Sequence, residues 1–390
     1  MKLKLTPAFV ILFCVAIFGS CKKPPEAPPG ADTHGTIVYV LGADSNHNFV
    51  YWKNGITANV PGTIATSVNT GGFYVSGNNI YAAGGNNFYV TTGNPATAEY
   101  WSNGAATTLP SSTGYAFASA VYASGGNVYV AGTTYYPQQL TVPYTTPTAS
   151  YPTAGYVATY WKNGVAATLP SLGIIGGDAG FYMTNYADYI SGIFVSGNDV
   201  YISGGSNISQ LGVDSSYRFA RYWKNGVPTE LVNGLVTNTP THNSFPNTAG
   251  IYVAGSDVYV AGVEAESDPQ VSGSLTLRAM YWKNGVANYL TTVAQSGAAA
   301  ASIFVSGSDV YVAGYETLNN YTYATYWKNG VATNLTSNVY SEASSIFVSG
   351  SDVYVAGFEV LNGIKYAVYW KNGTAVKLGA NYTASSIYVQ

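Results

Sequence analysis

The stretch Tyr369-Trp370-Lys371-Asn372-Gly373 recurs along the chain and decides the fold. Further copies begin at Tyr51, Tyr160, Tyr222, Tyr281 and Tyr326, and a copy with Ser in place of Lys spans Tyr100–Gly104. The chain has 7 Trp, and each belongs to one copy. Asn-Gly favours the type I′ turn, whose twist suits a tight β-hairpin. The repeat therefore predicts one hairpin per copy in a repeat protein.

Each copy lies in a longer unit of four segments. In the clearest unit they are Ser345–Gly350, Val353–Gly357, Tyr369–Gly373 and Thr374–Leu378. Each segment is rich in β-forming residues and is bounded by Gly or Asn, which is typical of a short strand. The first two segments are also joined by a tight turn, at Ser351-Asp352 in this unit. Each unit is therefore predicted to be a four-stranded antiparallel meander.

The segment count indicates how the chain closes. The last three segments of the unit each occur seven times, but the first segment occurs six times within the chain. Its seventh copy is Ser386–Val389, at the C-terminus. The two incomplete ends make one unit if the chain forms a ring, which removes open sheet edges. We expect an all-β seven-bladed β-propeller of four-stranded antiparallel blades, closed by a C-terminal innermost strand that pairs with three N-terminal strands.

The repeat resembles known propeller families. A strand, a Gly-containing turn, a second strand ending in Gly, and Tyr and Trp in the outer strands resemble kelch repeats. The kelch Gly-Gly doublet stands at Gly84-Gly85 and Gly204-Gly205. The Trp-x-Asn-Gly pattern with a distal Leu is also similar to repeats of bacterial secreted propellers. The resemblance covers Thr36–Gln390. It implies the propeller and its closure by an innermost C-terminal strand, and it implies no activity, because this fold has many functions.

The N-terminus has the features of a targeting signal. Lys2 and Lys4 precede an apolar run, Phe9–Phe18, which is too short to span a membrane. The following Gly19-Ser20-Cys21 resembles a bacterial lipobox, which implies lipidation of Cys21. The alternative is an ordinary secretory signal with an incidental Cys. We expect residues 1–20 to be a lipoprotein signal peptide, 21–35 a Pro-rich tether and 36–390 the propeller. The predicted location is the bacterial cell envelope, extracytoplasmic and lipid-anchored, at the outer membrane.

Composition excludes several classes of partner. Charged residues make up 8% of the chain and the formal net charge is −3, which argues against nucleic acid because phosphate contacts need clustered Lys and Arg. The 3 His have no metal-ligand spacing, so no metal and no cofactor is predicted. Phosphate-binding loops and nucleophile elbows are also absent from the sequence. We expect a monomer.

The repeated residues have a structural interpretation and a functional one. In a meander of four strands, the two kinds of tight turn share one face of the ring, which therefore carries the motif lysines and Asp199, Asp257, Asp309 and Asp352. These are either solvated turn residues or a charged docking face. Adjacent Tyr and Trp point to opposite sheet faces. We expect them to pack into two inter-blade interfaces, and the alternative is an aromatic binding ring.

Function is expected where the chain departs from the repeat. Successive Trp are 43 or 45 residues apart at the C-terminal end but 59 to 62 apart in the middle. The extra residues fall in predicted connections of blades 3 to 5, at Thr133–Thr159, Pro170–Gly192, Asn233–Gly250 and Val263–Ala279. Long connections on a regular scaffold often bind ligands. The candidate ligand-binding residues are Tyr135, Tyr136, Tyr182, Tyr186, Tyr189, Tyr217, Arg218, Arg221, His242 and Glu264.

Three functions remain open from the sequence. Rigid Tyr with few charges favours a membrane-anchored binding propeller with a protein or carbohydrate ligand. A carbohydrate-active enzyme, a glycoside hydrolase or lyase, would need paired carboxylates on the same face. The carboxylates available there are Asp178, Asp188, Asp214, Glu264, Glu266 and Asp268. A structural repeat protein of the cell envelope would instead have these connections packed on themselves. No catalytic residue is assigned.

Overall fold

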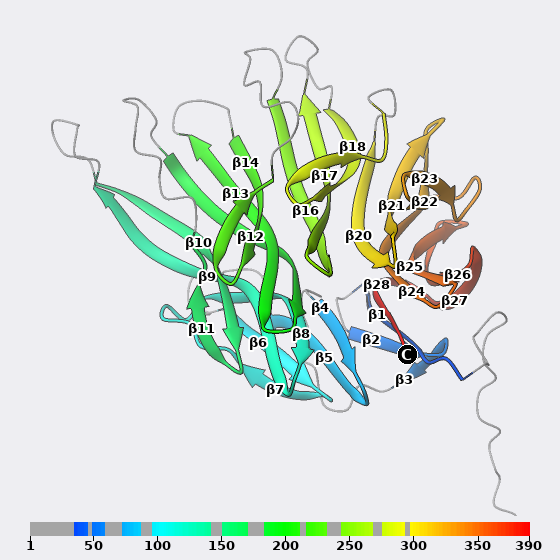
Figure 1. Ribbon diagram of the computed structural model, residues 1–390, viewed down its shortest axis with the longest axis horizontal. Coiled ribbons are helices and arrows are strands. Elements are labelled where there is room, and N and C mark those ends of the chain that lie inside the picture. Colours follow the sequence, from blue (N-terminus) through cyan, green and yellow to red (C-terminus); the bar gives the residue numbers. More distant parts are fainter. Residues whose placement is uncertain are drawn as a thin grey trace, which may run out of the picture.

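The computed structural model describes ten segments of the chain, and every regular element in them is a β-strand (Figure 1). The segments are 35–45, 49–58, 72–86, 96–141, 150–170, 183–210, 216–231, 243–267, 275–292 and 297–390. The all-β prediction is confirmed for these residues. Within them, no helix is long and apolar enough to cross a membrane.

Five four-stranded antiparallel sheets form regular blades. In four of them the strands follow chain order. They are β4 (Gly72–Ser76), β5 (Asn79–Asn86), β6 (Thr97–Ser102) and β7 (Ala105–Thr108); β16 (Asn243–Ala254), β17 (Asp257–Ser267), β18 (Leu275–Lys283) and β19 (Val286–Tyr289); β20 (Ala298–Ser306), β21 (Asp309–Leu318), β22 (Tyr321–Lys328) and β23 (Val331–Asn334); and β24 (Ser341–Ser349), β25 (Asp352–Leu361), β26 (Ile364–Lys371) and β27 (Thr374–Ala380).

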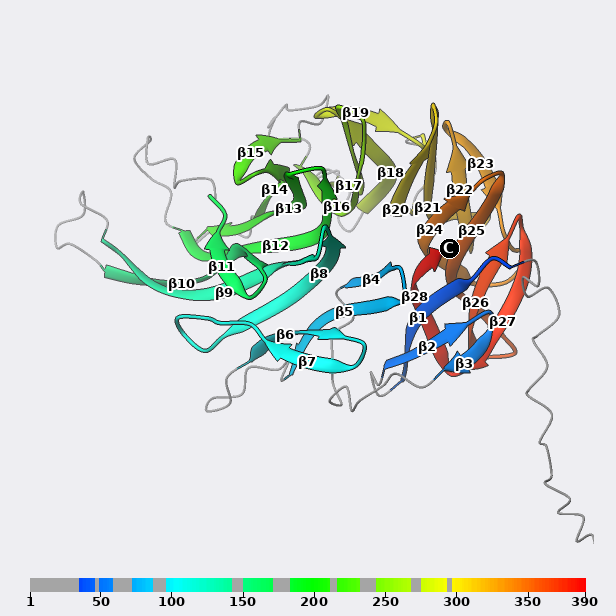
Figure 2. The same cartoon turned by 60° about the horizontal axis from the view of Figure 1, so that its bottom comes forward.

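The fifth blade joins the two ends of the chain. Its order is β28 (Tyr382–Val389), β1 (Val38–Asp44), β2 (Phe49–Lys53) and β3 (Ile56–Ala58). The pairing of β28 with β1 is antiparallel, from Val38↔Val389 to Asp44↔Tyr382. Two further backbone hydrogen bonds join Ile37 and Gln390, at 2.8 and 2.9 Å. The predicted pairing of a C-terminal innermost strand with three N-terminal strands is confirmed, and Figure 2 shows β28 beside β1.

The prediction of seven blades is wrong, because the remaining eight strands form one sheet instead of two blades. They are β8 (Ala116–Ser124), β9 (Asn127–Thr141), β10 (Ser150–Lys162), β11 (Val165–Thr168), β12 (Met183–Ser196), β13 (Asp199–Gln210), β14 (Ser216–Lys224) and β15 (Val227–Glu230). The propeller thus has five four-stranded blades and one eight-stranded sheet.

A short parallel pairing of β10 with β12 joins the two halves of this sheet. Its register partners are Gly155↔Tyr186 and Tyr156↔Ala187. The strands have 13 and 14 residues, whereas β22 and β24 at the corresponding places have 8 and 9. The added length extends β10 beyond its pairing with the short strand β11, and there β10 pairs with β12. Counting motif copies could not reveal this pairing, because it lies outside the repeated residues.

The Asn-Gly hairpins are confirmed in every copy of the motif. The seven Asn have φ between 49° and 51°, and the Gly that follows each has φ between 78° and 85°. Positive φ at both central residues defines the type I′ turn.

The second strand of the unit contains a Gly at a position where no side chain fits. A Cβ on Gly262 would lie 2.1 Å from the carbonyl oxygen of Asn247 and 2.7 Å from the Trp282 ring.

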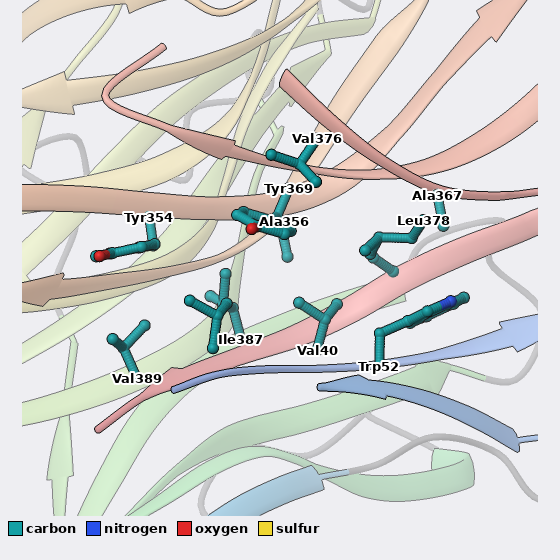
Figure 3. Packing of buried hydrophobic residues seen from close by; sticks show 12 residues of the cluster. Val40, Trp52, Tyr354, Ala356, Ala367, Tyr369, Val376, Leu378, Ile387 and Val389 are labelled. Atoms are coloured by element: carbon teal, nitrogen blue, oxygen red, sulfur yellow. The ribbon is translucent and has the colours of Figure 1, made fainter. Parts of the chain in front are cut away.

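The Tyr and Trp of each motif pack into different interfaces, as predicted. All seven Trp are at most 2% exposed. Trp161 belongs to a hydrophobic cluster with Val121 and Val130, whereas Tyr160 packs against the cluster that contains Trp223. Figure 3 shows the same arrangement where the chain ends meet, with Tyr369 of β26 and Trp52 of β2 in one cluster. The motif therefore holds neighbouring sheets together.

Candidate ligand-binding surface

The longest strands lie where the sequence departs from the repeat. β9, β10, β12, β13, β16 and β17 have 11 to 15 residues. Much of the sequence that was predicted to form connections is therefore strand. In Figure 1 the extended strands run upward on one side of the molecule. Strand extensions hold side chains more rigidly than loops do.

Three tyrosines lie side by side, two of them on the extended strands β9 and β10 and the third just before β8. The backbone N–H of Tyr135 donates to the carbonyl oxygen of Tyr115 at 2.9 Å, and Tyr135 is the register partner of Tyr156. The ring centroids of Tyr115 and Tyr135 are 5.8 Å apart, and those of Tyr135 and Tyr156 are 5.6 Å apart. Phe117 packs against Tyr156 at 5.6 Å. We call these four residues, all half-buried, the aromatic row.

Hydrogen bonds fix the backbone beneath the aromatic row. The Thr113 hydroxyl donates to the carbonyl oxygen of Tyr135 at 2.7 Å. The hydroxyls of Thr134 and Thr159 are 2.9 Å apart on paired strands. Burial raises the pKa of Tyr156, and the neighbouring tyrosines raise it further. Its hydroxyl is therefore neutral at physiological pH and able to both donate and accept a hydrogen bond.

The structure describes the side chains of five of the ten predicted ligand-binding residues. Tyr135 belongs to the aromatic row. Tyr136, Tyr186 and Tyr217 stand in β9, β12 and β14, but their side chains lie outside the described part of the structure. Tyr182, His242 and the lipidation candidate Cys21 lie outside the described residues altogether. Their predicted roles remain predictions.

Tyr189 joins β12 to the neighbouring blade. Its hydroxyl accepts the backbone N–H of Thr248 at 3.2 Å. Beside it the Ser191 hydroxyl is 2.8 Å from both the Ser203 and the Thr248 hydroxyls. Burial raises the pKa of Tyr189, and Arg218 and Arg221 lower it by a smaller amount. Tyr189 is therefore part of a hydrogen-bonded network that joins β12 to β16 of the neighbouring blade.

The two candidate arginines of β14 have different surroundings. Arg218 is exposed. Arg221 is completely buried, with its Nε 3.4 Å from Oε1 of Glu230 and its guanidinium 5.6 Å from the Trp223 ring. Their positions three residues apart on an extended strand place the side chains on opposite faces of the sheet.

The described carboxylates of the extension are engaged in internal contacts. Glu264 is buried and forms an ion pair with Arg278, whose guanidinium lies 4.3 Å from the Tyr289 ring centroid. Asp188 accepts the Ala158 backbone N–H at 2.9 Å and the Ser206 hydroxyl at 2.7 Å. Asp188 thus ties β12 to β10 where the two halves of the large sheet meet. Asp178, Asp214 and Asp268, and the side chain of Glu266, lie outside the described part.

Metal-ligand geometry is absent from the described part of the chain. No group of three or more His, Cys, Asp or Glu side chains lies close enough there to hold a metal ion.

The turn face carries a repeated clasp of Asp, Lys, Asn and Tyr. In one copy Lys328 Nζ is 2.8 Å from Asp309 Oδ2, and Asn329 Nδ2 donates to Asp309 Oδ1 at 2.8 Å. The Asn329 side-chain oxygen accepts the Val310 backbone N–H, and the lysine lies over the Tyr311 ring. Equivalent clasps form at Asp199, Asp257 and Asp352. The opposite charges pair within each of these four repeat units, which favours the structural interpretation of these residues over a docking face.

Seven further aromatic residues form a closed cycle of ring contacts that the sequence analysis missed. Neighbouring centroids are 4.2 to 5.5 Å apart. The cycle, which we call the axial ring, is Tyr74, Tyr122, Phe194, Tyr252, Phe304, Phe347 and Tyr388, from β4, β8, β12, β16, β20, β24 and β28. The signal was present, because each of the six first segments that is followed by a turn has an aromatic residue three positions before the first Gly of that turn.

Comparison with known proteins gives no family. No protein-family model matches the chain. No curated protein matches it either. The resemblance to kelch repeats therefore has no support from these comparisons.

Among solved structures, a glycoside hydrolase aligns with a TM-score of 0.32 and 8% identity, over 65% of this chain and 83% of that one. A Trypanosoma rangeli sialidase in complex with 2,3-difluorosialic acid aligns with a TM-score of 0.36 and 10% identity, over 90% and 56%. A Bombyx mori GH32 beta-fructofuranosidase in complex with sucrose aligns with a TM-score of 0.29 and 9% identity, over 83% and 89%. Likeness at this level carries no argument about ligand or activity.

The strand order decides the fold. Four-stranded antiparallel meanders are joined in a ring by the pairing of β28 with β1. The fold is a β-propeller. Its functional surface has to be argued from its own residues, because one fold has many functions.

Proposed function

We propose that this protein is an extracytoplasmic propeller that binds carbohydrate through the aromatic row. The observation that carries the proposal is the row itself, in which Tyr115, just before β8, Tyr135 of β9 and Tyr156 of β10 are neighbours. The aromatic row lies at the extended strands, away from the turn face, where the repeated Asp and Lys residues form ion pairs with one another. The proposal includes the membrane anchor at Cys21 and the Pro-rich tether expected from the sequence, at the outer membrane of a bacterial cell.

The chemistry of the aromatic row suits a sugar. Strands are about 4.8 Å apart, so three neighbouring tyrosines extend over roughly 10 Å. Each presents an apolar ring and a hydroxyl, and a sugar ring likewise has C–H faces and a hydroxyl rim. Tyrosine also has few rotatable bonds, so ordering it on binding costs little conformational entropy. A linear arrangement of such rings favours an oligosaccharide over a single sugar.

The described carboxylates support binding over hydrolysis. Glycoside hydrolysis uses two carboxyl groups on either side of the scissile bond. Asp188 accepts two hydrogen bonds from its own sheet, and Glu264 is paired with Arg278. In these roles both carboxylates support the fold.

The proposal is tested by screening the mature chain on an array of bacterial, plant and host oligosaccharides. We expect binding to a subset of glycans at micromolar to millimolar Kd, lost in the double variant Tyr135→Ala/Tyr156→Ala. Tyr321→Ala is the control, because Tyr321 is 50% exposed on a different blade. If no glycan is retained but a specific envelope protein is, the surface is a protein interface. If neither is retained, the structural alternative is favoured.

A further inference from the structure

Arg221 is a buried cation that the described residues do not satisfy. Its side chain is 0% exposed, and its Nε, Nη1 and Nη2 atoms have no hydrogen-bond partner among the described residues. Its one ion pair, with Glu230, is 3.4 Å long and lacks hydrogen-bond geometry. Buried polar groups are almost always paired, and a buried charge without a partner is strongly unfavourable. The Arg221 guanidinium is therefore unfavourable in the fold unless something else binds it.

Glu230 is a weak counter-ion. Burial raises the pKa of its carboxyl, and the nearby Arg221 guanidinium lowers it by a smaller amount. The Glu230 side chain is also 42% exposed, so water competes for its oxygens. An exposed carboxylate at 3.4 Å stabilises a buried guanidinium less than a bidentate pair does.

The repeat provides an internal comparison. Arg221 stands immediately before the Tyr of its motif, and the other copies have different residues at this position. They are Val50, Glu99, Thr159, Met280, Thr325 and Val368. Met280 is 0% exposed, so a neutral side chain fills this position completely. The Thr325 hydroxyl donates to the carbonyl oxygen of Tyr323 at 3.0 Å, so a polar residue at this position can have a partner within its own blade. The fold does not require a cation at this position.

We propose that Arg221 anchors an oxyanion of a bound ligand, with a carboxylate as the best match to its planar donors. The guanidinium presents up to five N–H donors in a fixed fork, which a carboxylate accepts in pairs. Glu230 stands at the solvent side of the site, and the entering anion replaces its contact with Nε. This site rests on residues other than the aromatic row, so either can fail without the other.

The experiment compares thermal unfolding of the full mature chain in D-glucuronate and in D-glucose at constant ionic strength, with sulfate and phosphate as further arms. We expect saturating glucuronate to raise the Tm by roughly 3 °C or more and glucose to leave it unchanged. A response to sulfate or phosphate alone identifies the group as an inorganic oxyanion and still supports the anion site. A wild-type chain that responds to no oxyanion overturns the proposal.

Variants distinguish a ligand anchor from a structural arginine. Arg221→Met copies the residue found at position 280, so we expect it to fold, with an anion-free Tm equal to or above that of the wild type. Its affinity for the anion should fall at least about tenfold. Glu230→Gln removes the competing carboxylate and should strengthen anion binding, which tests the site even if Arg221→Met misfolds. Lys365→Met removes a cation from another blade and should not change the response.

Two results contradict the assignment. One is an unchanged anion response in Arg221→Met. The other is weaker anion binding in Glu230→Gln, which would mean that the arginine needs Glu230 as its partner and is not available to a ligand.

Discussion

The indole N–H of Trp161 donates to the carbonyl oxygen of Pro110 at 2.9 Å, and this bond joins two neighbouring sheets. Trp223 makes a similar bond to Pro170 at 2.8 Å, which joins the two halves of the eight-stranded sheet. In each case the acceptor directly follows the Leu that ends the preceding unit. In these two copies of the motif, the tryptophan thus both fills an interface and connects its two sides.

This relationship predicts unequal effects for the same substitution in two copies. Trp327 is as buried as Trp161, but its indole nitrogen has no hydrogen-bond partner in the described part of the chain. Trp161→Phe should destabilise the protein by about 1 kcal/mol more than Trp327→Phe, because it also removes a hydrogen bond. Urea unfolding of both variants measures the difference. Equal losses would mean that packing alone sets the role of the tryptophan.

The turn-face clasps predict a loss of stability in acid. The Lys328 ammonium, followed by the Asn329 amide, lowers the pKa of Asp309, and the other three clasp aspartates are lowered by the same two kinds of partner. A carboxyl with a lowered folded-state pKa contributes stability above its unfolded value, near pH 4, and loses it as the pH falls through the folded value.

The matched variant for this prediction replaces all four clasp aspartates with Asn. Asn keeps the side-chain oxygen that accepts the Asn amide, as Asn79 does for Asn103. The Tm of the wild type should fall more steeply between pH 5 and pH 2.5 than that of the variant, as followed by circular dichroism. Parallel curves would show that these ion pairs do not control acid unfolding.

Glu316 predicts the opposite pH dependence. It is 4% exposed, and burial raises its pKa despite a hydrogen bond with Asn334. A carboxyl with a raised folded-state pKa loses stability as the pH rises through that value. Glu316→Gln should therefore increase the urea midpoint at pH 7 and change it little at pH 4. Glu359→Gln is the control, because Glu359 is the equivalent residue of the next blade but has Lys377 3.3 Å away, so its neutralisation should not stabilise.

The closure of the ring predicts a large effect of removing β28. Deletion of residues 381–390 leaves β1 as an open sheet edge and removes Tyr388 from the axial ring. It also uncovers Trp52, whose ring centroid is 5.7 Å from that of Tyr382. We expect a loss of more than about 4 kcal/mol and concentration-dependent aggregation. Unfolding and light scattering measure both, and a synthetic 381–390 peptide should restore stability. A truncated chain that stays soluble and equally stable would contradict closure by this strand.

The repeated part of the fold could be predicted because its signals are local. Asn329-Gly330 specifies its hairpin through positive φ at both residues, and adjacent Tyr160 and Trp161 must point to opposite faces of a strand. The pairing of β28 with β1 also followed from the sequence, because the two incomplete ends of the chain are complementary. None of these conclusions depends on contacts between non-repeated residues that are far apart in the sequence.

The parts of the fold that could not be predicted depend on such long-range contacts. The pairing of Tyr156 with Ala187 joins strands in parallel through non-repeated residues, and the sequence has no turn that marks it. The extensions were predicted to be connections because they lengthen the spacing between motif copies, and this spacing does not distinguish a longer strand from a longer loop. Tyr115 was missed as a site residue because it precedes a predicted strand, and its neighbour Tyr135 comes from the next strand.

The most direct test of the account is the Kd of the mature chain for the best oligosaccharide from the array, measured by isothermal titration calorimetry. The account predicts that Tyr156→Ala weakens binding at least about tenfold, because removal of a central aromatic side chain from an interface typically costs more than about 1 kcal/mol of binding free energy. Tyr321→Ala should leave the Kd within about twofold of the wild type. An unchanged Kd in Tyr156→Ala, with the fold intact by circular dichroism, would contradict the assignment of the aromatic row as the binding surface.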